Sequence, residues 1–167
     1  MNRFARLVVP AVAALLVASC GDLTASSYGA EAHTVNVALT STGKAVHQFG
    51  TDDTKTAGAT AFEGTGTDSD GHEVSVVLHA LINYASGSGE FASVIALDFG
   101  DGNTVVAYTT HGVTTKTSDG AHVHALYSIQ GGTGNYQSAT GTVSYVGDRH
   151  SALGGNVQST FTVSISK

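Results

Sequence analysis

Alternation of apolar and polar residues at every second position is the feature that most constrains the fold of this chain. It is clearest at the C-terminus, where Val157, Phe161, Val163 and Ile165 share one face of the run 156–165. A repeat of two is that of a β-strand, and no long window of the domain has helical periodicity. Nine runs, of which 46–49 is the weakest, predict eight or so strands: 34–39, 46–49, 59–67, 72–83, 91–99, 104–111, 121–130, 142–146 and 156–165.

Two of these runs are apolar on both faces. In the run 72–83, Val74 and Leu78 share one face while Val77 and Leu81 share the other, and the next run has the same character. A strand of this kind must be covered on both sides. In a small barrel the interior is one cover and a neighbouring subunit is often the other, so we expect a homo-oligomer, with a trimer as one form.

The fold that these strands predict is an all-β, eight-stranded antiparallel β-barrel, with a β-sandwich as the alternative. Closure would protect a long final strand that has one strongly apolar face and would otherwise leave an unpaired edge. Pro10 is the only proline, so turns depend on Gly, Asn, Asp and Ser. We expect one turn at 41–43 and a hairpin turn at 100–103.

The charge balance argues against nucleic acid as a partner. The chain has 13 acidic and 7 basic residues, for a formal net charge of -6. Beyond the N-terminus the basic residues are scattered singly, whereas binding to a phosphate backbone requires a clustered basic surface.

The N-terminus has the pattern of a bacterial lipoprotein signal. Arg3 and Arg6 precede an apolar run at 7–17, and small residues then lead to Cys20, the single cysteine. We expect Cys20 to be lipidated and to become the mature N-terminus, since an exported chain with one cysteine has no disulfide use for it. An ordinary cleaved signal peptide or a buried cysteine is the alternative.

These features divide the chain into a signal peptide at 1–19, a lipidated tether at 20–32 and a barrel domain at 33–167. Acyl chains at the N-terminus would anchor the protein stably in a membrane. We therefore expect it in the cell envelope, outside the cytoplasm, in the periplasm or at the cell surface. The sequence does not indicate which membrane holds it.

A glycine-rich segment at 129–141 lies between two predicted strands. Consecutive glycines permit positive φ and close backbone approach, and Tyr136 could fold back over the end of a barrel. The segment resembles the turn of the allene oxide cyclase and dirigent superfamily, in which a strand runs into a Gly-Gly-Thr/Ser-Gly turn followed by an aromatic. An ordinary bulged hairpin is the alternative. The residues that carry the resemblance are Gly131, Gly132, Thr133, Gly134, Tyr136, Ala139 and Gly141.

The resemblance implies an eight-stranded barrel that holds a hydrophobic small molecule and templates its cyclisation or isomerisation without a cofactor. The alternative function is a non-catalytic module for small-molecule binding or envelope interaction. A lumen cavity of roughly 300 Å³ or more, lined by polar groups, would favour the first, and a plugged lumen would favour the second. The catalytic residues of the family do not map onto positions of this sequence.

Tyr127 is the first candidate for a ligand cavity, because it shares a strand face with apolar residues. Tyr108 and His111 lie on opposite faces of a regular strand, so we expect only one of them to face the cavity with Tyr127. His79 and Asp98, on neighbouring strands, could form a buried pair. Each of these groups could instead be a satisfied structural polar residue.

The sequence gives little support for a metal site, a catalytic nucleophile or a phosphate-binding loop. His122 and His124 are two apart on one strand face, but no suitably spaced carboxylate follows, so we expect no metal and no cofactor. The segment 87–89 is not a nucleophile elbow, and 131–134 leads into a strand and not into a helix that could bind phosphate.

Overall fold

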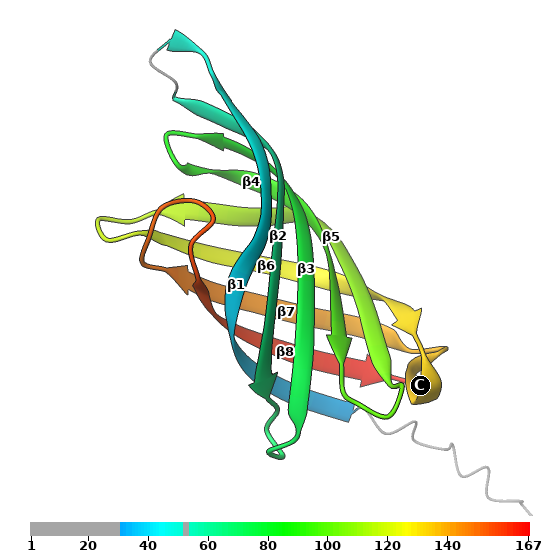
Figure 1. The fold of residues 1–167 in the computed structure, drawn as a ribbon. Helices are drawn as coiled ribbons and strands as arrows, with labels where there is room; N and C mark the ends of the chain where they lie inside the picture. Colours follow the sequence, from blue (N-terminus) through cyan, green and yellow to red (C-terminus); the bar gives the residue numbers. More distant parts are fainter. Residues whose placement is uncertain (1–30, 52–53) are drawn as a thin grey trace, which may run out of the picture.

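Eight strands follow one another around a closed barrel. The computed structural model describes residues 31–51 and 54–167, so the expected signal peptide, Cys20 and most of the tether lie outside the described residues. Each strand pairs antiparallel with the next, and β1 pairs with β8 (Figure 1). The predicted all-β, eight-stranded antiparallel barrel is confirmed. The strands are β1 (Glu31–Phe49), β2 (Lys55–Thr67), β3 (Glu73–Ala85), β4 (Ser88–Asp98), β5 (Thr104–Lys116), β6 (Ala121–Gly132), β7 (Thr140–Arg149) and β8 (Val157–Ser166).

Strand β1 joins the two sides of the barrel. Its first part pairs with β8 and its last part pairs with β2 up to Phe49, so it bends from one group of strands to the other (Figure 1). A β-bulge lies between Ser41 and Gly43. The predicted turn at 41–43 was therefore wrong: 34–39 and 46–49 belong to one strand, because a bulge bends a strand without ending it. This strand begins at Glu31, two residues before the expected domain boundary.

The barrel interior is filled by side chains. Tyr127 and Phe161 are the largest fully buried residues, and Tyr145 stacks on Phe161 with ring centroids 4.7 Å apart and planes 9° from parallel. The inward residues of every strand join this core. A barrel of eight strands has an interior just wide enough for side chains to fill, and aromatic side chains occupy that space here.

One end of the barrel, which we call the closed end, is capped by the glycine-rich segment. The segment contains the 3-10 turn η2 (Gly134–Tyr136), and the Tyr136 ring is buried 5.5 Å from that of Phe99. The Tyr136 hydroxyl donates to Glu31 Oε1 at 2.9 Å, and Lys167 Nζ lies 2.6 Å from Glu31 Oε2. Lys167 is the main reason that the pKa of Glu31 falls to about 2. A side chain at Gly132 would collide with the carbonyl oxygen of Thr104, so the corner requires glycine there.

The opposite end, which we call the open end, is formed by the connections β1–β2, β3–β4, β5–β6 and β7–β8. Leu153, in the β7–β8 connection, packs against the core, and its carbonyl accepts a hydrogen bond from Lys44 Nζ at 3.2 Å. The two ends therefore differ in how they are built.

No helix in the described ranges is long and apolar enough to cross a membrane.

Candidate functional site

The cavity inside the barrel lies toward the open end and is small. Its volume is about 40 Å³, and its lining includes Tyr84, Thr114, Tyr145 and Arg149. Cavities that hold ligands of drug size have volumes of roughly 300 to 1,000 Å³. The interior therefore has space for a water molecule or a small group, and it lacks the ligand-sized cavity that a reaction in the lumen would need.

Tyr127 points into the barrel, as the alternation of β6 predicts, but it does not line this cavity. Its hydroxyl lies 2.5 Å from Ser93 Oγ, and both residues are buried. Burial raises the pKa of Tyr127, and the hydrogen bond with Ser93 only partly opposes this effect. Tyr127 is thus a satisfied polar group within the core.

The other inward tyrosines are also neutral hydroxyl groups at physiological pH. Burial raises the pKa of Tyr145 to about 12. Burial also raises the pKa of Tyr84, whose hydroxyl is 2.8 Å from Thr114 Oγ1. A phenol of this kind can donate a hydrogen bond to a ligand, but it is a poor general base because its ionised form is scarce.

Arg149 is the charged group of the interior. It lies at the end of β7 and is 8% exposed, and its Nε donates to the Ser151 carbonyl at 3.2 Å. Among the described residues, no carboxylate lies within 4.0 Å of its guanidinium. Its positive charge opposes the effect of burial on the pKa of both Tyr84 and Tyr145. The arginine is therefore buried beside phenols, and the part of the chain that the structure describes places no carboxylate within 4.0 Å of it.

A depression of about 290 Å³ at the open end leads to this arginine, and we call it the vestibule. Lys116 on β5 contributes a second positive charge to its lining. Tyr84, Arg149 and Leu153 line both the vestibule and the internal cavity, so the two spaces adjoin. Cationic, phenolic and apolar groups thus converge at one opening.

Sequence reasoning missed Arg149, although a signal for it was present. Val143, Tyr145 and Gly147 alternate along β7, and continuing that alternation places Arg149 on the inward face. The predicted strand ended at Val146, so the arginine was placed outside it. A strand extended by three residues would have predicted a cation inside the barrel.

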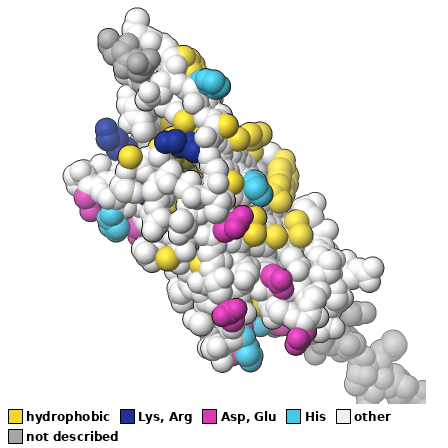
Figure 2. Space-filling model, in the orientation of Figure 1, with side chains coloured by type: hydrophobic (Ala, Val, Ile, Leu, Met, Phe, Trp, Pro, Cys, Tyr) yellow, Lys and Arg dark blue, Asp and Glu magenta, His cyan; other side chains and the backbone are white. Residues whose placement is uncertain are grey.

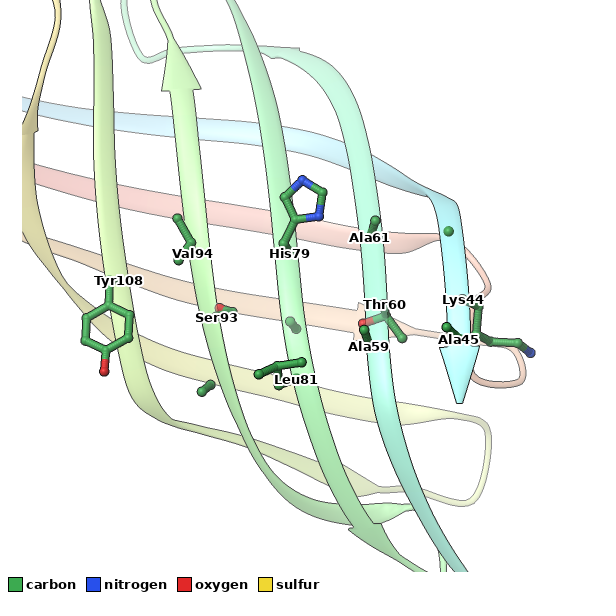
Figure 3. Close-up of a pocket in the computed structure, with 13 residues that line it drawn as sticks. Lys44, Ala45, Ala59, Thr60, Ala61, His79, Leu81, Ser93, Val94 and Tyr108 are labelled. Carbon is green, nitrogen blue, oxygen red and sulfur yellow. The ribbon is translucent and has the colours of Figure 1, made fainter. Parts of the chain in front are cut away.

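A second depression lies on the outer surface, over β1 to β5, with a volume of about 440 Å³. Small residues on β1 and β2, including Ala45, Ala59 and Ala61, form its floor. Leu81 of β3 projects next to them, and Tyr108 of β5 lies at the other side of the groove, beyond Val94 of β4 (Figure 3). We call this surface the outer groove. Figure 2 shows hydrophobic side chains, with histidines among them, gathered on one flank of the barrel.

Two of the predicted cavity residues lie on this outer surface. His79 and Tyr108 line the outer groove and face away from the lumen. Asp98 is exposed at the end of β4, where its Oδ1 accepts the N–H of Gly100 at 2.9 Å. His79 pairs across the sheet with Val94, whereas Asp98 pairs with Ser75, so the suggested buried pair of His79 and Asp98 does not form.

The expectation that Tyr108 and His111 face opposite ways was also wrong. Both are exposed, because the register of β5 with β6 shifts between Tyr108 and Val113. An irregularity of this kind changes which residues face outward. Gly112 is buried there, and a side chain on it would collide with the ring of Phe91.

The two histidines considered for metal binding do not converge on a common point. The rings of His122 and His124 are 6.3 Å apart, and His122 Nδ1 lies 2.8 Å from Asp148 Oδ1. Among the described residues, metal-ligand geometry occurs in a different group at the closed end, His33, Asp68 and Asp70. Sequence spacing could not indicate this group, because strand closure and a turn bring its members together.

Comparison with known proteins gives no relative. No protein-family model matches the chain, and no curated protein and no solved structure is significantly similar to it. The resemblance of the glycine-rich segment to allene oxide cyclases therefore stays a prediction. The function has to be inferred from the geometry of the barrel.

The bond between Tyr127 and Ser93 gives the first prediction. In Tyr127→Phe the buried Ser93 hydroxyl loses its partner, so the free energy of unfolding should fall by about 1 to 3 kcal/mol. The double variant with Ser93→Ala should lose less than the sum of the single variants, because both then remove one shared interaction. Urea unfolding measures all three. Tyr108→Phe on the outer surface is the control and should change stability by less than about 0.5 kcal/mol; an equal effect at both tyrosines would contradict this reading.

Proposed function

We propose that this chain is an exported, lipid-anchored binding module without catalytic activity, which takes a small molecule with an anionic group and an apolar body at its open end. The observation that carries the proposal is Arg149, buried at the vestibule with no carboxylate within 4.0 Å among the described residues. A buried charge without a partner is unfavourable, and an anionic ligand would supply the partner.

The size of the interior supports binding over catalysis. Templated cyclisation requires a cavity that encloses the reacting chain and excludes water. The cavity of about 40 Å³ is too small for this, whereas the vestibule of about 290 Å³ is open to solvent and close to ligand size. These volumes favour the non-catalytic alternative over a reaction in the lumen.

The donor groups define the class of ligand. A guanidinium offers a planar pair of N–H donors that match a carboxylate or a phosphate, and Lys116 adds a compact positive charge. The Tyr84 side chain provides ring surface beside them. Ala152 and Leu153, which also line the vestibule, would contact the apolar part of the molecule.

We infer that the open end faces away from the membrane. The first described residue, Glu31, lies at the closed end, where it contacts Tyr136 and Lys167 (Figure 1). If Cys20 carries the lipid, the membrane lies beyond the closed end. The vestibule would then face the aqueous space of the envelope or the cell exterior, where it could receive a diffusing ligand.

The second prediction tests this ligand class with the fluorescent probe 1-anilinonaphthalene-8-sulfonate, which combines an anionic group with aromatic rings. The full-length protein in detergent should bind it, and decanoate should displace it while decanol does not. Arg149→Gln should weaken decanoate binding by at least about tenfold, as expected for a charged hydrogen bond of roughly 1.5 kcal/mol or more. The measurement is a competition titration followed by fluorescence.

Two further variants make the result interpretable. Lys116→Gln removes a surface charge in the vestibule without touching the core, so it should weaken binding even if Arg149→Gln fails to fold. Lys55→Gln makes the same charge change outside the vestibule and should leave the affinity unchanged. Equal displacement by decanoate and decanol, or equal effects of Lys116→Gln and Lys55→Gln, would refute the proposal.

A second candidate role, self-association, rests on the outer groove. Leu81 is 66% exposed, Val94 and Tyr108 are each 44% exposed, and the residues that line the groove include no carboxylate. A chain with a formal net charge of -6 repels a copy of itself over most of its surface. A groove whose lining is apolar and has no acidic group is where two copies could meet with the least repulsion, and a second copy there would supply the outer cover that β3 and β4 require.

The third prediction tests this contact. Leu81→Lys should convert an oligomer to a monomer, because it places a charge in the centre of an apolar interface. Leu126→Lys is the matched control, since Leu126 is 64% exposed on β6 outside the groove and should leave the oligomer intact. Sedimentation equilibrium in detergent measures the mass of the protein. A monomeric wild-type chain, or equal dissociation by both variants, would rule out this interface.

A further inference from the structure

His33, Asp68 and Asp70 meet at the closed end of the barrel, far from the vestibule, and His72 lies beside Asp68. His33 lies on β1, and Asp68, Asp70 and His72 lie in or beside the turn that joins β2 to β3. One potential ligand atom from each of His33, Asp68 and Asp70 lies within 4.8 Å of the others. His72 Nδ1 is 3.4 Å from Asp68 Oδ2. The group thus combines imidazole and carboxylate donors around a single turn.

Asp68 is a buried carboxylate held in position by the turn itself. Its side chain is 2% exposed, and its Oδ1 accepts the N–H groups of Asp70 and His72, each at 2.9 Å. No lysine or arginine in the described ranges lies within 4.0 Å of the carboxylate. A fixed negative charge is therefore present without a permanent positive partner.

His33 presents a bare nitrogen to this carboxylate. Its Nε2 is 2.7 Å from Glu31 Oε1, and an ionised carboxylate accepts hydrogen bonds, so Nε2 carries the proton. In the neutral ring, Nδ1 is then an acceptor, and it is fully buried with no hydrogen-bond partner. It lies 3.5 Å from Asp68 Oδ2. Two acceptors that face each other in a buried site require a positive charge between them, which either a proton on Nδ1 or a bound metal ion would supply.

We propose that His33, Asp68 and Asp70 bind a zinc ion, and that the exposed His72, which contacts Asp68, moves in as the fourth ligand. Nitrogen and oxygen ligands lie about 2.0 to 2.2 Å from zinc in a tetrahedral site, which places neighbouring ligand atoms roughly 3.3 to 3.5 Å apart. The separations of Asp68 Oδ2 from the Nδ1 atoms of His33 and His72 are 3.5 and 3.4 Å. The donor set also favours zinc over calcium or magnesium, which prefer oxygen ligands.

The surroundings of His33 support a ligand role. The Glu31 carboxylate that accepts from Nε2 is itself held by Tyr136 and Lys167, and the imidazole packs against Phe99 with ring centroids 5.1 Å apart. A carboxylate behind a histidine fixes the ring orientation and the tautomer in many metal sites. Asp70 and His72 are exposed, so they could close over an arriving ion.

The site departs from the sequence expectation that the chain binds no metal, which rested on His122 and His124. Those residues are on the outer surface of β6, whereas this group sits beside the glycine-rich corner and the start of the barrel. A zinc ion here would tie the β2–β3 turn to the first residues of β1. It would therefore stiffen the end of the domain from which the tether leaves.

The fourth prediction is tested on full-length protein in detergent after removal of metal with a chelator. Titration with zinc chloride by calorimetry should show one tight site per chain, and zinc should raise the melting temperature because it binds the folded state. Cobalt chloride should give the visible absorption of a four-coordinate ion. Asp68→Asn should lower zinc affinity by more than about 100-fold, beyond the 10- to 100-fold effect of outer-shell changes.

Matched variants separate this site from adventitious binding. Asp68→Asn keeps the oxygen that caps the turn. If Asp68→Asn fails to fold, His33→Gln replaces it as the test and should also weaken zinc binding. Asp148→Asn is the control, because Asp148 also pairs with a histidine, His122, but outside this group. The proposal is overturned if zinc does not bind at millimolar concentration, if Asp148→Asn weakens binding as much as Asp68→Asn, or if cobalt binds without the absorption of a four-coordinate ion.

Discussion

The closure of β1 onto β8 is the constraint on which the rest of the structure depends. Closure fixes an eight-stranded barrel whose interior side chains can fill, so the inward aromatic rings become a core and leave a cavity of about 40 Å³. A lumen filled in this way cannot also hold a ligand of ordinary size. Arg149 and Nδ1 of His33, the buried polar groups that lack a full set of partners among the described residues, lie at the two ends of the barrel. The exposed apolar residues of the outer groove lie on the outer surface.

The two ends divide the chemistry between them. The closed end gathers anionic and imidazole groups around Asp68, next to the corner capped by Tyr136. The open end gathers the cations Arg149 and Lys116 next to a small apolar space. Because the tether would leave from the closed end, a cation site there would serve structure near the membrane, while the open end would be free to bind an anion.

Much of the barrel could be predicted from the alternation of residues, because strands with one inward face repeat through the chain. The inward position of Tyr127 and the corner role of the glycine-rich segment follow from the same pattern. The bulge near Ser41 and the register shift after Tyr108 could not be predicted, since both depend on how strands curve in a closed sheet. His33 and Asp68 meet through pairing across the barrel end, and their contact leaves no local signal. Arg149 was predictable, and it was missed because β7 was assumed to end too early.

The central claim is that the barrel interior is a packed core and that ligands bind at its open end. The most direct test is a crystal structure of the protein grown with decanoate. The account predicts the carboxylate beside Arg149, the alkyl chain in the vestibule, and an intact hydrogen bond between Tyr127 and Ser93. Density for an alkyl chain running between Tyr127 and Phe161, with their rings displaced, would contradict it.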